Sequence, residues 1–427
     1  MNTAFLRTLF LPQTRSAPEP IRPGLYHYLR ENQGQYTRFH LRVEPDGRGI
    51  LLANATAAAH LSPVGVVIVK GIMEKQSESD LQRAVQMRFS GMTKAQLQKD
   101  FTEVQTLLST LSAPGDHYPI LNLEDAATSA TGTRLIAPLE ATIPLDEPKK
   151  LLPLLNRLWD IAIPHVTLMV PEYANTDYLV QAVERAEDLG MICGVSGRAT
   201  DLIKGTLLDD LAMAGLDHVT VYYASAQSDL HDELFGDGDH LAARQVFTRT
   251  QHLEIADVAH IPLIQATLPG LDDTLASLHA LRVPNVAFFA IASAEDTSEG
   301  AISAEAMRQV AVQVEEEAAQ ANVRYIWEPP IQRNPARPLT DQLRSGPRCS
   351  TDFAIRVEPT GAVIPPRGPY QMAGNVLKDH WDNIWNTEAF HSYHTRIQTS
   401  TRCAQCPGLA ICAADCPADQ RGWSREG

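Results

Sequence analysis

The stretch Ala214-Gly215-Leu216-Asp217-His218-Val219-Thr220-Val221-Tyr222-Tyr223 sets the pattern of the central part of the chain. A helical segment at about 205–214 ends at its glycine, and the apolar run that starts at His218 is typical of a buried strand. From Arg134 onward such strands and helices alternate. Because parallel strands need a crossover between them, this alternation predicts parallel βα units.

Five more strands and five more helices continue the alternation. The strands are expected at 135–142, 165–170, 191–195, 261–267 and 285–291, and the helices at 147–159, 177–189, 241–252, 271–281 and 303–321. A complete βα barrel has eight repeats. The sequence therefore predicts an α/β fold with an incomplete barrel of six βα units.

The composition is that of an ordinary globular protein. The 427 residues suffice for two or three domains, with 44% hydrophobic and 20% charged residues. The formal net charge of -15 argues against nucleic-acid binding, and no apolar run approaches the length of a membrane span. In the absence of a secretory signal, we expect a cytoplasmic protein whose thiols stay reduced.

The first ninety or so residues are expected to form a unit of their own. The alternating segment 36–43, the turn residues Glu44-Pro45-Asp46-Gly47 and the apolar segment 50–54 predict a β-hairpin. Three helices are expected after it, starting near Pro63, Ser79 and Lys94. The proline, glycine and small polar residues of 113–133 predict a linker.

Four cysteines cluster late in the sequence, in the run Cys403-Ala404-Gln405-Cys406-Pro407-Gly408-Leu409-Ala410-Ile411-Cys412-Ala413-Ala414-Asp415-Cys416. The spacing C-x2-C-x5-C-x3-C lets turns of the backbone direct several thiolates at one soft metal centre. An iron-sulfur cluster fits this run. Spacing alone leaves a zinc site or a disulfide staple open.

The segment before the run resembles the SPASM domain, a C-terminal extension of many radical SAM enzymes that carries auxiliary iron-sulfur clusters. Arg348-Cys349-Ser350 is followed by two strand-like segments around Gly361, then by Gly374-Asn375 and Ile384-Trp385. Two departures matter. The family usually has a Cys five residues after the turn glycine, where this chain has Pro366, and a further Cys after the run, of which there is none up to residue 427.

The resemblance implies a metal-binding C-terminal domain with Cys349, Cys403, Cys406, Cys412 and Cys416 as ligands. In the family, seven cysteines serve two clusters, and the fourth Cys of the run belongs to the first cluster. Two complete four-cysteine clusters are therefore not available here. A single 4Fe-4S centre on the run is expected, with zinc as the alternative, and Asp415 could supply an oxygen ligand if Cys416 turns back toward Cys349.

The central part resembles the barrel of radical SAM enzymes. The passage from Ala214 to Tyr223, followed by His231-Asp232 and Gly236, matches a family pattern, and with the tail the resemblance covers 134–419. The family binds its catalytic cluster through C-x3-C-x2-C after the first barrel strand, which leaves one iron open for S-adenosylmethionine. Here Pro144 runs almost directly into Leu145-Asp146-Glu147-Pro148, and no Cys precedes Cys193.

A second part of the family's pocket is also altered. Where the family has Gly-Gly-Glu-Pro after the second strand, this chain has Val170-Pro171-Glu172-Tyr173. Glu172 is the one cofactor-binding position retained, whereas Val and Pro replace glycines that let a ligand approach the backbone. The sequence therefore predicts that S-adenosylmethionine does not bind.

Other candidate residues have more ordinary interpretations. Cys193 is expected to be a small buried side chain, and His231-Asp232 to order a loop. Tyr222, Tyr223 and Asp232 are expected near the remaining cavity at the strand ends, where α/β folds place ligands. No nucleophile, base and orienting group can be named together, so the catalytic residues, if any, are unknown.

Residues 26–112 resemble PqqD-like winged-helix modules, which bind the leader peptides of ribosomally made natural products. The resemblance rests on strands with an Asp46-Gly47 turn, three helices, and Asp100 in the last helix. It implies that a leader or precursor peptide adds a strand to the edge of the small sheet. A winged-helix domain that only packs against the rest of the chain is the alternative.

Together these observations divide the chain into five parts: a tail (1–25), a PqqD-like winged-helix domain (26–112), a linker (113–133), a degenerate radical-SAM-like barrel (134–345) and a SPASM-like metal-binding domain (346–427). The first functional hypothesis is a pseudoenzyme that binds a peptide and a metal cluster and assists a partner modifying enzyme in a ribosomal peptide modification pathway. The second is an active enzyme, with its cofactor or cluster supplied unusually or with another chemistry in the barrel pocket.

Overall fold

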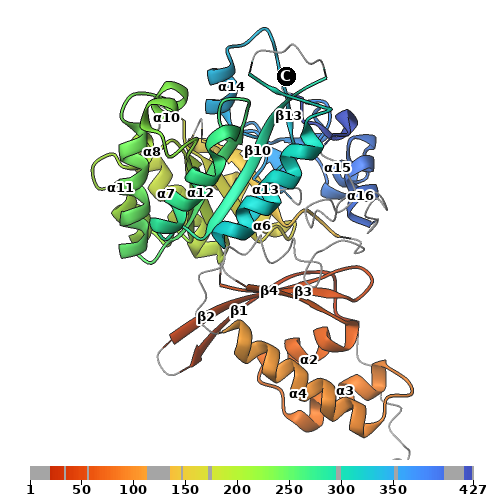
Figure 1. Cartoon of the computed structure of the whole chain (residues 1–427). Coiled ribbons are helices and arrows are strands. Elements are labelled where there is room, and N and C mark those ends of the chain that lie inside the picture. Colours follow the sequence, from red (N-terminus) through yellow and green to blue (C-terminus); the bar gives the residue numbers. More distant parts are fainter. Residues whose placement is uncertain are drawn as a thin grey trace, which may run out of the picture.

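The computed structural model describes residues 20–32, 35–54, 57–112, 135–145, 148–171, 176–294, 300–350, 354–398 and 418–425. In these ranges the chain forms a four-stranded antiparallel sheet and a larger, mainly parallel sheet. The small sheet lies between three helices and the larger part of the molecule (Figure 1). None of the helices described is long and apolar enough to cross a membrane.

The small sheet is a meander of β1 (Gly24–Asn32), β2 (Gln35–Val43), β3 (Gly49–Ala53) and β4 (Ala57–Leu61). β2 and β3 form the predicted hairpin, and β1 begins two residues before the boundary expected at Tyr26. The sequence did not predict β1 or β4. β4 reads Ala-Ala-Ala-His-Leu, which is poor in the β-branched and aromatic residues that favour strands.

Three helices cover one face of this sheet: α2 (Pro63–Met73), α3 (Glu78–Arg88) and α4 (Lys94–Leu111). Ser62 caps α2, with Pro63 in the first turn as predicted. Ser77, and not Ser79, caps α3, because its hydroxyl accepts a hydrogen bond from the Asp80 amide at 3.2 Å. Phe39 of β2 belongs to the core under these helices.

The opposite face of the small sheet contacts the larger part of the chain. Successive residues of a strand point to opposite faces, so the neighbours of Phe39 on β2 face the other way. Arg38 Nη1 donates to the Met191 carbonyl at 2.8 Å, and His40 Nε2 bonds to the Gly190 carbonyl. Because Gly190 and Met191 directly precede a parallel strand, the small sheet covers the amino-terminal edge of the parallel strands and leaves their carboxyl ends uncovered.

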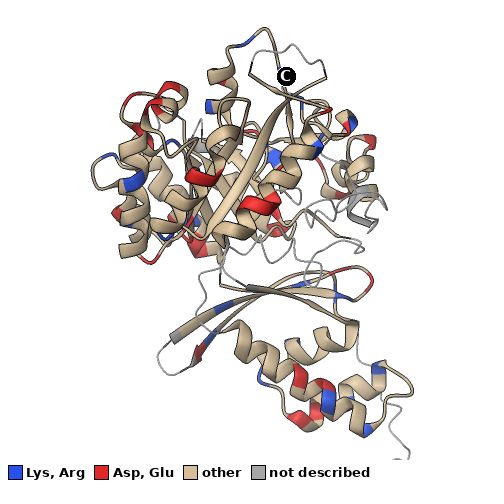
Figure 2. Cartoon of the chain, in the orientation of Figure 1, with Lys and Arg blue, Asp and Glu red and all other residues tan. Residues whose placement is uncertain are grey.

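Six parallel strands form the centre of the large sheet in chain order: β5 (Glu140–Pro144), β6 (His165–Met169), β7 (Ile192–Gly197), β8 (His218–Tyr222), β9 (Ala256–Leu263) and β10 (Asn285–Ser293). The helices that follow them are α6 (Pro148–Asp160), α7 (Thr176–Leu189), α8 (Ala199–Leu202), α9 (Leu207–Met213), α10 (Ser228–Phe235), α11 (Asp239–His252), α12 (Leu271–Ala280) and α13 (Met307–Ala321). The predicted alternation of six βα units is confirmed. Charged residues lie mostly on helices and loops, and the ribbon of β10 carries none (Figure 2).

Two of the six strands are shifted from their predicted positions. The strand expected at 135–142 begins only at Glu140, because side chains take up the preceding backbone groups: Trp385 Nε1 donates to the Leu135 carbonyl at 3.1 Å and Trp381 Nε1 to the Ile136 carbonyl at 2.8 Å. The strand expected at 261–267 spans 256–263, since Thr267 Oγ1 bonds to the Pro262 carbonyl and closes a turn.

Short strands extend the sheet at both ends. β14 (Ala354–Val357) pairs in parallel with β5 and continues into β15 (Ala362–Ile364) and β16 (Gly374–Asn375), while β11 (Ile302–Ser303), β12 (Arg324–Trp327) and β13 (Ile331–Gln332) pair with β10. The remaining helices are α14 (Leu339–Ser345), α15 (Trp381–Trp385) and α16 (His391–Gln398), with short 3-10 turns at Leu268–Gly270, Glu388–Phe390 and Gln420–Gly422. In the described ranges the hydrogen-bonded path runs from β11 to β16 without closing.

Candidate functional site

A cavity of about 580 Å³ lies at the carboxyl ends of the first four parallel strands. One side is formed by residues at or after the strand ends, which include Pro144, Val170, Arg198 and Tyr222. The other side is formed by α14 and by the end of β14. The volume is in the range of small-molecule and cofactor sites. We call this space the mouth cavity.

Arginines and carboxylates line the mouth cavity in equal number: Arg198, Arg344, Arg356, Asp201, Asp341 and Glu358. Two of the arginines already hold a carboxylate. Arg198 donates from Nε and Nη2 to Asp201 Oδ2 at 2.9 and 2.8 Å. Arg356 donates from Nε to Glu358 Oε1 at 2.8 Å. The cavity therefore combines charged groups of both signs with apolar strand ends.

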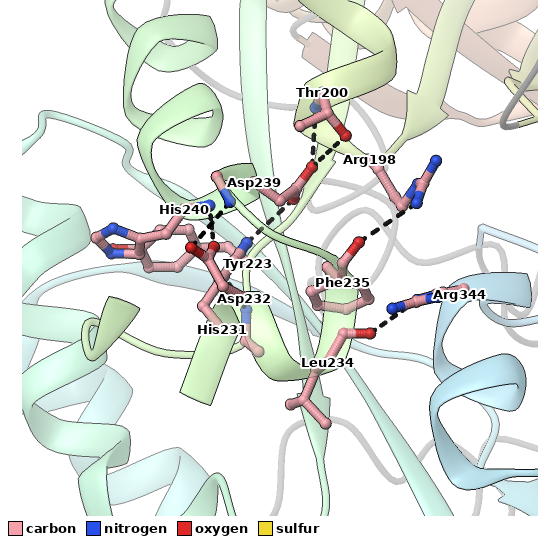
Figure 3. A network of polar contacts seen from close by, with 12 residues as sticks. Arg198, Thr200, Tyr223, His231, Asp232, Leu234, Phe235, Asp239, His240 and Arg344 are labelled. Atoms are coloured by element: carbon pink, nitrogen blue, oxygen red, sulfur yellow. Dashed lines mark hydrogen bonds and ion pairs between the residues drawn. The ribbon is translucent and has the colours of Figure 1, made fainter. Parts of the chain in front are cut away.

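The carboxyl end of α10 fixes two of the arginines. Arg344 Nε donates to the Leu234 carbonyl at 3.0 Å, and Arg198 Nη1 donates to the Phe235 carbonyl at 3.3 Å. The last carbonyls of a helix have no partner within the helix, so these bonds satisfy groups that would otherwise need water. Figure 3 shows the two guanidinium groups reaching α10 from different elements.

A small enclosed chamber lies next to the mouth cavity, and Met169 and Tyr222 line both spaces. Its volume of about 20 Å³ is enough for one water molecule. His260 and Glu328 line the chamber, and His260 Nε2 lies 2.8 Å from Glu328 Oε2. Both side chains are buried. The pair combines a potential base with a group that orients it, which the sequence alone did not identify.

A second buried polar group occupies the interior of the sheet. The Nε2 atoms of His165 and His218 lie 2.6 Å apart, and Glu140 accepts hydrogen bonds from Thr167 Oγ1 at 2.6 Å and from Ser350. Burial lowers the pKa of His165 to about 3 and also lowers that of His218. Both rings are therefore neutral at pH 7, so one donates to the other. Their only sequence signal was that each residue begins a strand.

The other predicted pocket residues lie in different places. Tyr222 lines the mouth cavity as expected, but Tyr223 points to the opposite face, where its hydroxyl lies 3.3 Å from His240 Nε2. Asp232 accepts hydrogen bonds from the Gly238 and His240 amides at 3.0 and 2.8 Å (Figure 3), so it orders the loop as predicted. Glu172 lies outside the described residues.

The predicted metal ligands can be placed only in part. Cys349 is buried just before β14, and burial raises the pKa of its thiol. Cys403, Cys406, Cys412 and Cys416 all lie outside the described residues. Cys193 is fully buried in β7, as predicted. Among the described side chains, no group of three or more His, Cys, Asp or Glu residues is arranged to hold a metal ion.

The connection after the first parallel strand is short. β5 ends at Pro144 and α6 begins at Pro148, so only Leu145, Asp146 and Glu147 lie between them. The Leu145 amide donates to the Met169 carbonyl at 2.9 Å, and the Leu145 side chain is buried against the mouth cavity. An apolar residue therefore lies where the chain leaves β5.

A scan against protein-family models and a search of curated proteins found no match to the sequence. Among solved structures, SuiB from Streptococcus suis has a TM-score of 0.53 at 12% identity, over 94% of this chain and 99% of SuiB. SuiB has also been solved bound to S-adenosylmethionine and bound to the precursor peptide SuiA. Structures of anSMEcpe with bound AdoMet and the Cp18Cys peptide cover 67% of this chain and 93% of theirs, with a TM-score of 0.46 at 12% identity. The SuiB match shows that this chain shares the overall fold of SuiB over nearly its whole length.

Proposed function

We propose that this chain is a peptide-binding protein of a ribosomal peptide modification pathway, that its barrel has lost S-adenosylmethionine cleavage, and that it assists a partner modifying enzyme. One observation carries the loss of cleavage: three residues connect β5 to α6, and none of them is a cysteine. A cluster with an open iron needs three thiolates close together, and this connection supplies none.

The wall of the mouth cavity supports the same proposal. Val170 and Pro171 line the cavity directly after β6, where the resembling family has glycines. Each adds a side chain that keeps a ligand away from the backbone, and proline also removes an amide donor.

Peptide binding is proposed at β1, an edge strand of the small sheet. An edge strand presents unpaired backbone groups to which an extended peptide can add, as in β-augmentation. Leu29 of β1 and Tyr36 of β2 are 63% and 62% exposed. The register pairs Leu29 with Arg38 and Glu31 with Tyr36, so the two apolar side chains lie on the same face. Leu29 would contact a side chain of the added peptide, and Tyr36, one strand further in, extends the apolar surface beside it. That SuiB has been solved bound to a precursor peptide supports peptide binding by this chain.

The C-terminal cysteines would hold one 4Fe-4S cluster, with zinc as the alternative. Cys349 fits a soft-metal ligand in chemistry and in burial. The run from Cys403 to Cys416 would supply the other thiolates. Such a centre stabilises the fold by the free energy of metal binding and can pass electrons to a partner.

Metal analysis and cofactor titration test the loss of cleavage. The protein is purified anaerobically, its iron, sulfide and zinc are measured, and S-adenosylmethionine is titrated in with and without dithionite. We expect about four irons per chain, as in one 4Fe-4S cluster, and no cleavage of the cofactor. Formation of 5′-deoxyadenosine by the reduced protein would refute the proposal.

A pair of matched variants tests the peptide site. Leu29→Ser should weaken binding of a precursor peptide encoded beside the gene about tenfold, because it removes apolar area from the contact. Leu241→Ser is the control, since Leu241 is 62% exposed, close to the 63% of Leu29, but lies on α11. Equal affinities for the two variants would rule out the β1 site.

A second candidate is an enzyme with another chemistry in the barrel. The observation that favours it is the buried pair of His260 and Glu328 beside a chamber that has room for water. Such a pair can act as a general base with its orienting carboxylate. If product forms from a peptide substrate without S-adenosylmethionine, and Glu328→Gln abolishes it while the variant stays folded, this candidate replaces the first.

A further inference from the structure

We infer that the mouth cavity binds a carboxylate that is attached to an apolar body, such as a glutamate side chain within an apolar peptide segment. This site is separate from the peptide site proposed at β1. The small sheet covers the amino-terminal edge of the parallel strands, whereas the mouth cavity lies at their carboxyl ends.

Arg344 provides the first donor group. Its Nε is held by the Leu234 carbonyl at 3.0 Å, so its position does not depend on a ligand. Its terminal nitrogens make no hydrogen bond to any residue that the structure describes. Because a guanidinium offers paired N–H groups in one plane, a carboxylate can be bound through two parallel hydrogen bonds.

Arg356 provides the second donor group. Its side chain is 17% exposed, its Nε holds Glu358, and its Nη1 lies 3.0 Å from the Met169 sulfur. A thioether is a weak acceptor, so a carboxylate oxygen would be a better partner for this nitrogen. Met169 lines both the mouth cavity and the enclosed chamber. A ligand that displaces Met169 would therefore change the wall that these two spaces share.

The balance of charge favours a carboxylate over a phosphate. Asp201 and Glu358 already engage Arg198 and Arg356, and Asp341 also lines the cavity, so its lining carries no surplus positive charge for a dianion. A single carboxylate requires only one guanidinium for a bidentate contact. Pro144, Leu145 and Val170 provide an apolar wall for the rest of the ligand.

Calorimetry with two blocked tripeptides tests this inference. We expect acetyl-Leu-Glu-Leu-amide to bind the full-length protein at least tenfold more tightly than acetyl-Leu-Gln-Leu-amide, since the two differ only in the carboxylate. Binding of pyrophosphate without binding of the glutamate peptide would overturn the inference, as would equal binding of the two peptides.

Substitutions locate the site on the protein. Arg344→Gln and Arg356→Gln should each weaken binding of the glutamate peptide about 10- to 100-fold, because each removes a charged hydrogen bond. Arg344→Lys, which keeps the charge but not the paired donors, should lose less than Arg344→Gln. Arg83→Gln is the control, as Arg83 is an exposed arginine on α3. Unchanged affinity in both cavity variants, with thermal unfolding like that of the native protein, would contradict the inference. Failure of peptide binding at β1 would leave this result unaffected.

Discussion

Arg42 Nε donates to Glu44 Oε1 at 2.7 Å, and both side chains are fully buried where the small sheet meets the larger part of the chain. Arg42 Nη1 also donates to the Pro138 carbonyl at 2.7 Å, and Glu44 Oε2 accepts from the Ile136 amide at 2.7 Å. One ion pair at the end of β2 thus satisfies backbone groups in the segment that leads into β5. It joins the two parts of the chain by polar contacts that water does not reach.

Loss of this pair should destabilise the protein strongly. Arg42→Met leaves the Glu44 carboxylate buried without its charge partner, and we expect the free energy of unfolding to fall by about 3–5 kcal/mol. Urea unfolding followed by circular dichroism measures the change. Arg48→Met is the control, because the Arg48–Asp46 pair is exposed and should contribute less than about 1 kcal/mol. Similar losses in the two variants would contradict this account.

Two glycines with positive φ differ in what an added Cβ atom would contact. Gly346 and Gly205 have φ of +64° and +56°, so alanine at either position is strained. At Gly346 a Cβ atom would also lie 2.5 Å from the Tyr222 hydroxyl oxygen, whereas at Gly205 it would meet nothing within 4 Å. Gly346→Ala should therefore lower the free energy of unfolding by about 1–3 kcal/mol more than Gly205→Ala. Equal effects in thermal unfolding would show that Tyr222 can move aside without cost.

The pair of His260 and Glu328 should contribute to stability whether or not it acts in catalysis. Glu328→Ala removes the acceptor that lies 2.8 Å from His260 Nε2, and a buried donor left without a partner costs about 1–3 kcal/mol. Glu328→Gln keeps an acceptor oxygen and should cost less. Urea unfolding of both variants, with the exposed Glu31→Ala as control, measures the difference. A loss in Glu328→Gln as large as in Glu328→Ala would show that the charge matters more than the hydrogen bond.

The stability of the protein should depend on pH through Asp217. Burial raises the pKa of Asp217 from 3.8 to about 6, against the opposing effects of Arg38 and the Cys193 amide. Because the folded pKa exceeds the unfolded one, the stabilisation from this group is fully present below about pH 4 and is lost as the pH rises to about 6. A shift of this size corresponds to about 2–3 kcal/mol. Urea unfolding at pH 4, 5, 6 and 7 should show Asp217→Asn gaining stability relative to the native protein with rising pH, and parallel pH profiles would contradict the prediction.

Local rules predicted most of the secondary structure. The alternation of apolar strands and amphipathic helices indicated six βα units, and all six are present. A helix that buries one face has apolar residues at three- and four-residue spacing, and a buried strand is a short apolar run, so both can be recognised locally. Ser62 and Pro63 marked the start of α2 through capping, which depends only on neighbouring residues. The short connection after Pro144 could likewise be read directly from the sequence.

The candidate site could be predicted only in part. Tyr222 was expected at the strand ends, but no sequence pattern singled out Arg198, Arg344 or Arg356. Arg198 follows β7, Arg344 lies on α14 and Arg356 lies on β14. These three arginines line one cavity because β14 pairs with β5 and α14 lies across the strand ends. That pairing joins segments more than two hundred residues apart, which no local pattern can indicate.

The sequence by itself determined the order of the elements, the capping of α2 and the absence of cysteines after the first parallel strand, because each depends on residues close together in the chain. Only the tertiary structure decided where β5 begins, which arginines share a cavity and which buried histidines pair. Those outcomes depend on contacts between distant segments. The bonds from Trp381, Trp385 and Arg42 to the backbone before Glu140 show the physical reason, since side chains from both ends of the chain took up groups that a strand would otherwise have used.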